Sequence, residues 1–206
     1  MKLYYFLPSN NSRRAHAVAL HLNIPIEFEP INLQAGEHRT PEFLALNPAG
    51  RVPVLQADDF VLWESNAIAQ YLASQTPNSL WPDNPKSRAA ITSWQCWELA
   101  HLSKGTQPLQ YERFVKKVLQ LGQPDERVVQ QATNIFHKEA TVLEQHLSEH
   151  PYLVGDTLTI ADFAVASDFT YAELCQFPLE NYPHICHWYA QIDALPAWQK
   201  TSPQSA

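Results

Sequence analysis

Residues 51–72, RVPVLQADDFVLWESNAIAQYL, carry the pattern that decides the fold of the first part of the chain. Two short apolar runs, 52–56 and 60–63, flank a pair of aspartates, which is the pattern of two strands joined by a tight turn. From residue 65 the apolar side chains recur at helical spacing. We therefore expect a β-hairpin followed directly by a helix.

The residues before this unit alternate strands with helices. Residues 2–7 form an apolar, β-rich run, and helical spacing follows from Ser12. Residues 24–33 alternate apolar and polar positions as a second strand does, and Thr40-Pro41 begins a short helix with threonine as its N-cap. The order β-α-β-α-β-β-α predicts a small mixed sheet whose first strands pair in parallel through a crossover helix.

A proline-rich stretch, PNSLWPDNPK at residues 77–86, is the candidate domain boundary. Every long segment beyond it has helical spacing, so the sequence predicts an α/β domain over 1–76 and an all-α domain over 87–206. Thr159 and Asp162 fit a capping box at one helix start. The other expected helix starts are Asn84-Pro85, Pro124-Asp125 and Asn181-Tyr182-Pro183.

The composition excludes several classes of protein. Five scattered glycines cannot supply G-x-G-x-x-G or a Walker-type loop, which argues against a nucleotide-binding fold. A net charge of −7 without a basic run argues against a nucleic-acid partner. No apolar run reaches the roughly 18 residues that a membrane span needs. Three cysteines without paired spacing are typical of reduced thiols, so we expect a cytoplasmic protein.

Residues 9–14, SNNSRR, lie where the first strand turns into the first helix. A helix N-terminus presents unpaired N–H groups and a partial positive charge, which favour an anion such as a thiolate. A serine hydroxyl there could also donate a hydrogen bond to that anion. In the alternative interpretation, Ser9 or Ser12 only caps the helix and the two arginines are solvated.

Two further stretches carry possible binding groups. Because proline cannot donate to a sheet ladder, Val52-Pro53 predicts either an edge position or a cis bond. A cis bond would leave the Val52 N–H and C=O free to pair with a peptide-like ligand as an added strand. Glu64-Ser65 stands at a helix start, where the Ser65 hydroxyl either holds a carboxylate or caps the helix.

These stretches together resemble the cytosolic glutathione transferases, along the whole chain. The resemblance is closest to the serine-type classes (phi, theta, delta and bacterial or cyanobacterial relatives such as chi). YYFLPSNNSRR resembles their serine loop, and GEHRTPEFLALNPAGRVPVL the segment from the glycyl-carboxylate site to the cis-proline. WESNAIAQYL resembles the glutamate-serine motif, and GDTLTIADFAVASDF the capping box and helix of the second domain. The resemblance implies an α/β thioredoxin-like N-terminal domain and an all-α C-terminal helical domain, the glutathione transferase fold.

The resemblance also implies roles for individual residues. Ser9 matches the catalytic serine, whose hydroxyl would favour the glutathione thiolate, and Asn11 is its rival. Val52 would pair its backbone with the cysteinyl part of glutathione, beside a cis Pro53. The other implied contacts are Asn10, Asn11 and Ser12 in the serine loop, His38, Arg39 and Arg51 at the glycyl carboxylate, and Glu64 and Ser65 at the γ-glutamyl end. The arginines in these ligand-facing stretches are Arg13, Arg14, Arg39 and Arg51.

The implied activity is conjugation of reduced glutathione, as co-substrate, to small hydrophobic electrophiles such as isothiocyanates or aryl halides. The alternatives are a glutathione-dependent peroxidase or disulfide reductase on the same fold, a non-catalytic binding module, and a ligand carrier. A homodimer is implied, and no metal is expected because the histidine pairs 146/150 and 184/187 lack a third ligand. The residues implied to line the electrophile pocket are Leu7, Pro8, Trp94, Trp97, His101, Tyr111 and Phe114.

Overall fold

The computed structural model describes residues 1–203 and divides into two compact units. The first unit contains residues 1–82 and the described residues from Asp193 onward, and the second contains residues 83–192. The division predicted from the sequence keeps the end of the chain with the helical domain. In the structure, the short helix α10 (Pro196–Gln199) instead packs against α1 (Asn10–His21) of the first unit.

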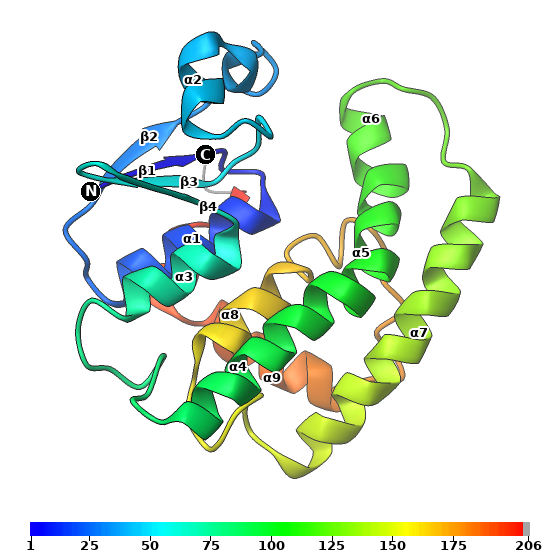
Figure 1. Cartoon of the computed structure of the whole chain (residues 1–206). Coiled ribbons are helices and arrows are strands. Elements are labelled where there is room, and N and C mark those ends of the chain that lie inside the picture. The colour runs from blue at the N-terminus through cyan, green and yellow to red at the C-terminus, as the bar shows by residue number, and fades with distance from the viewer. Residues whose placement is uncertain (204–206) are drawn as a thin grey trace. The chain divides into compact units, whose positions relative to one another are not determined.

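The first unit is built on a four-stranded mixed sheet in the order β2-β1-β3-β4. The parallel pairing of β1 with β2 and the β3–β4 hairpin are those predicted from the sequence. Helices α1 and α3 lie on one side of the sheet and α2 on the other (Figure 1). The elements not yet delimited are β1 (Lys2–Tyr5), β2 (Glu27–Pro30), β3 (Val54–Ala57), β4 (Phe60–Trp63), α2 (Pro41–Leu46) and α3 (Ser65–Ala73).

The core of this unit lies between the sheet and helices α1 and α3. Leu3 and Leu55 from the sheet are fully buried, and so are Val18 of α1 and Ile68 of α3. Strands β1 and β4 are both antiparallel to β3 and therefore run in the same direction. Because α1 follows β1 and α3 follows β4, the N-termini of the two helices come to the same edge of the sheet. This is the edge where the predicted ligand-binding stretches lie.

His16 is a buried titratable residue on the inner face of α1. Its side chain is 8% exposed. The centroid of its ring lies 4.0 Å from the ring centroid of Phe28 and 4.9 Å from that of Tyr5. Burial lowers the pKa of His16 to about 4. As the pH falls from about 6.5 toward 4, the unfolded chain binds a proton here and the folded chain does not. Stability therefore decreases as the pH falls through this window.

Between about pH 7.5 and pH 5, we expect the titration of His16 to lower the free energy of unfolding by about 2 kcal/mol. A His16→Phe variant keeps a ring against Tyr5 and Phe28 but cannot titrate. Urea unfolding of both proteins at the two pH values measures the difference in their pH dependence. The same pH dependence in wild type and variant would show that His16 does not contribute.

The second unit is helical throughout its long segments. A continuous helical run passes from α4 (Pro85–Trp97) through α5 (Ser103–Gln110) to α6 (Lys116–Val118). Two π-helical segments, Glu98–Leu102 and Tyr111–Val115, join these helices. The predicted helix starts at Asn84, Asp125 and Thr159 are confirmed, and the side chain of each of these residues caps its helix by accepting a backbone N–H. The remaining helices are α7 (Glu126–Glu149), which runs beside α5 in Figure 1, α8 (Ile160–Ser167) and α9 (Pro183–Asp193).

The capping box of α8 has more partners than the sequence predicts. Asp162 is fully buried, and its carboxylate accepts the Thr159 N–H at 2.8 Å and the Thr159 hydroxyl at 2.9 Å. It also accepts the Leu153 N–H and the Trp188 indole N–H, each at 3.0 Å. One carboxylate thereby ties α8 to the preceding loop and to α9.

Helices α5 and α7 cross at Gly105. A Cβ atom at this position would lie 2.7 Å from the backbone N and 2.9 Å from the Cα of Phe136. Backbone atoms cannot move aside as the end of a flexible side chain can. The close approach of the two helices therefore depends on glycine.

We expect Gly105→Ala to lower the free energy of unfolding by about 2 kcal/mol because overpacking outweighs the better helix propensity of alanine. Lys104→Ala, at the exposed neighbouring position, is the matched control and should be nearly neutral. Thermal unfolding compares the variants. A Gly105→Ala protein as stable as wild type would contradict the close approach.

Candidate active site

Ser9 is the N-cap of α1 in extended backbone geometry, and its Oγ accepts the Ser12 N–H at 3.3 Å. The helix begins at Asn10, slightly before the start predicted at Ser12. A hydroxyl that accepts one hydrogen bond can still donate its own proton. Capping the helix and donating to a ligand anion are therefore compatible roles for Ser9.

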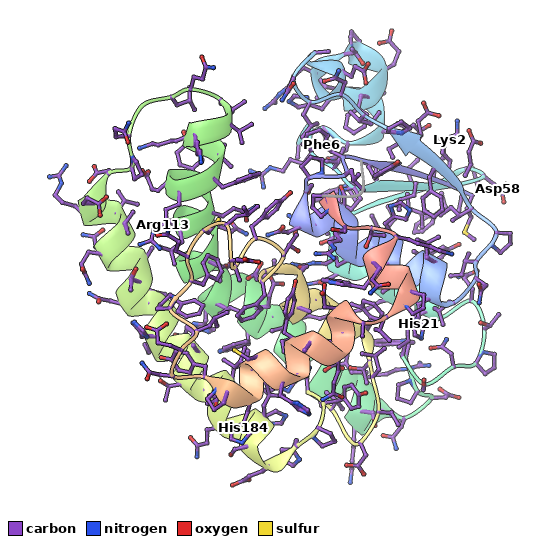
Figure 2. The ribbon with its side chains drawn as sticks, turned by 180° about the vertical axis from the view of Figure 1, so that it is seen from behind. Lys2, Phe6, His21, Asp58, Arg113 and His184 are labelled. Carbon is purple, nitrogen blue, oxygen red and sulfur yellow. The ribbon has the colours of Figure 1, made fainter. Side chains whose placement is uncertain are left out.

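Ser12 and the two arginines that follow it point into the first unit. The Ser12 hydroxyl oxygen accepts the N–H of Phe6, labelled in Figure 2 at the end of β1. Arg13 stacks on the Trp198 ring at 4.0 Å and donates to the Trp198 carbonyl at 3.2 Å. Arg13 and Arg14 are 4% and 1% exposed. They are neither solvated nor ligand-facing, because both guanidinium groups are buried within the unit.

The segment before β3 is held by Asn47, which is not among the predicted site residues. Asn47 is 2% exposed, donates from Nδ2 to the Arg51 carbonyl at 2.8 Å and accepts the Ala49 N–H at 3.0 Å. The signal for it is Asn-Pro-Ala-Gly at the end of a helix, because asparagine side chains stabilise such turns. Gly50 has a φ of 58°, and a Cβ there would lie 3.1 Å from Nη1 of Arg39.

The Val52-Pro53 peptide bond is cis, as the family resemblance implies. Val52 lies between the Asn47 turn and β3, outside the pairing of the sheet. Within residues 1–203, the Val52 N–H and C=O make no hydrogen bond. They are thus available to the backbone of an extended ligand.

The N-terminus of α3 brings Glu64 and Ser65 to the same place. Glu64 has a φ of 74°, a left-handed conformation that is costly for a residue with a side chain and that recurs at ligand-binding and active sites. The Ser65 side chain is 4% exposed, and its hydroxyl donates to Oδ1 of Asn11 at 3.4 Å. Residues from two helix N-termini therefore meet here.

A small cavity of about 50 Å³ lies between these segments of the first unit. Six of the residues expected at the glutathione site line this cavity, together with Asn47. Ser9, Asn10, Ser12, His38 and Arg39 do not line it. The lining residues are Asn11, Asn47, Arg51, Val52, Pro53, Glu64 and Ser65.

Comparison with known proteins assigns this arrangement to a family. The family model for the glutathione S-transferase N-terminal domain matches residues 1–74, and that for the C-terminal domain matches residues 95–196. The chain belongs to the glutathione S-transferase family. The resemblance seen in the sequence motifs is thereby confirmed.

Relatives of the transferase match over nearly its full length. Glutathione S-transferase 3 of Zea mays is 35% identical over 98% of this chain and 92% of its own length. The probable glutathione S-transferase GSTF2 of Oryza sativa subsp. japonica is 32% identical over 98% of this chain and 95% of its own. The solved structure of glutathione transferase F7 from Populus trichocarpa has a TM-score of 0.89, at 29% identity over 97% of this chain and 96% of its own.

The residues of the helical unit that are predicted to line the electrophile pocket differ from one another in their contacts and in their exposure. Trp94 packs edge-on against Trp97 at 5.1 Å and against His146 at 4.8 Å, while the Trp97 indole N–H donates to Glu139 at 3.1 Å. The side chains of Trp94 and Trp97 therefore contact α7. His101 and Tyr111 are exposed.

Phe114 stacks on Tyr171, with ring centroids 4.6 Å apart. Next to it, Arg113 (Figure 2) donates to the carbonyls of Cys175 at 2.8 Å and Gln176 at 2.7 Å. These contacts join the π-helical segment to the loop after α8. In the first unit, Leu7 is half-buried and Pro8 is exposed in the turn between β1 and α1.

Residues 1–203 contain neither a helix suited to span a membrane nor a cluster of side chains suited to hold a metal ion. None of their helices combines the length and the apolar character that crossing a membrane requires. No three His, Cys, Asp or Glu side chains in that part of the chain converge as ligands of a metal would.

Proposed function

We propose that this glutathione transferase joins the sulfur of reduced glutathione to small hydrophobic electrophiles such as isothiocyanates or aryl halides. The observation that carries the proposal is the cavity at the N-terminus of α3, where Glu64, Ser65, Asn11 and Val52 meet. Each of these residues can pair with a part of glutathione, an anionic tripeptide whose backbone would extend along the cis-proline turn.

The cavity suits the γ-glutamyl end of glutathione. This end carries an ammonium and a carboxylate on one carbon. The Glu64 carboxylate attracts the ammonium, while the Ser65 hydroxyl and the N–H groups of α3 favour the carboxylate. A volume of about 50 Å³ accommodates such an end group and not the whole tripeptide.

The rest of glutathione would extend from the cavity along Val52. The Val52 N–H and C=O would pair with the cysteinyl backbone in the manner of an added strand. The glycyl carboxylate would meet cationic side chains near the Asn47 turn, because Arg39 approaches Gly50 and Arg51 follows it. His38 completes this set in the sequence prediction, with Asn10 and Ser12 in the serine loop.

The thiol would lie at the N-terminus of α1, where Ser9 can donate a hydrogen bond to the sulfur anion. The thiolate then attacks the electrophilic carbon and forms a carbon–sulfur bond. A halide leaves from an aryl halide, whereas an isothiocyanate takes up a proton and becomes a dithiocarbamate. In the first unit, Leu7 and Pro8 in the turn between β1 and α1 would contact the electrophile.

Solved structures of relatives with bound ligands support the proposal that this protein binds glutathione and an electrophile. A theta-class transferase from Xanthomonas axonopodis pv. citri, 29% identical with a TM-score of 0.87, was solved with glutathione bound. Glutathione S-transferase I from maize, 30% identical with a TM-score of 0.88, was solved in complex with an atrazine glutathione conjugate. Binding of a conjugate is consistent with transfer to an electrophile.

We further propose a cytoplasmic homodimer. Cys96, Cys175 and Cys186 are free thiols, consistent with a reducing compartment. Large apolar side chains are exposed on each unit, including Phe60 and Trp63 at 45% and 44%, and exposed apolar patches commonly mark subunit contacts. Light scattering coupled to gel filtration measures the mass directly.

Turnover of glutathione with four substrates tests the proposed reaction. The panel comprises an isothiocyanate, an aryl halide, a hydroperoxide and a small disulfide. We expect the highest kcat/KM with one of the first two. Faster reaction with the hydroperoxide or the disulfide would assign the enzyme to reduction instead, and glutathione binding without any turnover would indicate a binding module.

A further inference from the structure

Arg14 is a buried cation one turn beyond Asn11 in α1. Its side chain is 1% exposed, and its Nη1 donates to Oδ1 of Asn66 at 2.9 Å. Asn66 directly follows Ser65 at the start of α3. Arg14 therefore joins the two helices whose N-termini border the cavity.

The Arg14–Asn66 bond has a weaker companion. Asn11 and Arg14 are three residues apart on α1 and so share a face, while Ser65 and Asn66 are consecutive on α3. The companion bond, from Ser65 to Asn11, is 3.4 Å long and joins two neutral groups. The buried, charge-assisted bond is the stronger of the two and sets the spacing of the helices at this point.

The amide of Asn66 depends on Arg14 for its orientation. Asn66 is 8% exposed, and its Nδ2 has no hydrogen-bond partner within residues 1–203. Asn66 is also absent from the lining of the cavity. It acts on the cavity through its neighbour Ser65 and does not contact a ligand there.

We propose that Arg14 and Asn66 are positioning residues for glutathione. They hold Ser65 and the N–H groups of α3 at the distance from Asn11 that the γ-glutamyl end requires. The inference rests on the proposed glutathione site. Because the thiol binds at the start of α1 and not at α3, loosening the pair affects glutathione affinity and leaves activation of the thiol unchanged.

Four variants test the inference. Arg14→Lys loses the planar fork, and Asn66→Ala loses the acceptor, so each should raise the Kd for glutathione about tenfold. Asn66→Asp keeps an acceptor for Arg14 and should stay within about threefold of wild type. Arg13→Lys is the matched control, because Arg13 is also buried but contacts Trp198, and it should leave Kd unchanged.

The measurements are calorimetric titration with glutathione, kcat and KM, the pH profile, and hydrogen exchange of residues 64–68 without ligand. We expect faster exchange in Arg14→Lys and Asn66→Ala, with kcat and the pH midpoint unchanged. Folded variants with the wild-type Kd would overturn the positioning role while the proposed function stands. If Arg14→Lys does not fold, Asn66→Ala decides by the same criterion. A wild-type protein that binds no glutathione would overturn both proposals.

Discussion

Replacing Ser9 by alanine is expected to raise the pH midpoint of kcat/KM by about one to two units, because the glutathione thiolate loses a donor. Each unit corresponds to about 1.4 kcal/mol of thiolate stabilisation, so turnover at neutral pH should fall about 10- to 100-fold. The Ser9 hydroxyl accepts the Ser12 N–H and retains its own proton for the sulfur. A pH profile of kcat/KM with a fixed electrophile measures the shift.

Two control variants separate activation from capping and binding. Ser9→Thr keeps a hydroxyl at the N-cap and should retain most of the wild-type midpoint. Asn11→Ala removes a side chain that lines the cavity and accepts from Ser65, so it should raise KM for glutathione. If the pH midpoint of kcat/KM shifts in Asn11→Ala and not in Ser9→Ala, the residue that activates the thiol is Asn11 and not Ser9.

Asp162→Ala is expected to lower the free energy of unfolding by about 4 kcal/mol, because four buried donors lose their acceptor. For a chain of this length, that corresponds to a fall in Tm of roughly 10 °C. The backbone of Leu153 and the indole of Trp188 would both be left unpaired. Thermal and urea unfolding measure the loss.

Asp125→Ala provides the comparison for an ordinary helix cap. Asp125 caps α7 by accepting the Arg127 N–H from a more exposed position, so its loss should cost about 1 kcal/mol. Equal effects of the two substitutions would mean that the additional partners of Asp162 contribute nothing. Asp162→Asn, which keeps one oxygen acceptor, should lie between the two.

The sequence predicts those features whose cause is local. Thr40, Asn84 and Thr159 begin helices because their side-chain oxygens bond backbone N–H groups within a few residues. The β3–β4 hairpin follows from two apolar runs and a two-residue turn. At Pro53 the strand pattern alone leaves an edge position or a cis bond open, and the cis bond that the structure has was implied by the family resemblance.

Features that depend on distant partners were not predicted. From the sequence, Arg13 and Arg14 are two charged residues that would be expected to face solvent or a ligand. Their burial depends on contacts with Trp198 and Asn66, which lie far away in the sequence. Helical spacing likewise does not show that the Trp97 indole N–H donates to Glu139 of α7. The two π-helical segments carry no local signal beyond ordinary helical spacing.

The most direct test of the central claim is a pH titration of the thiol of glutathione bound to the wild-type protein. Ultraviolet absorbance of the thiolate reports its ionisation while saturating glutathione keeps the site occupied. We predict a bound thiol with a pKa about two units below the ordinary value of about 8.5. A protein that binds no glutathione, or that binds it with a thiol titrating as in free solution, would contradict the claim.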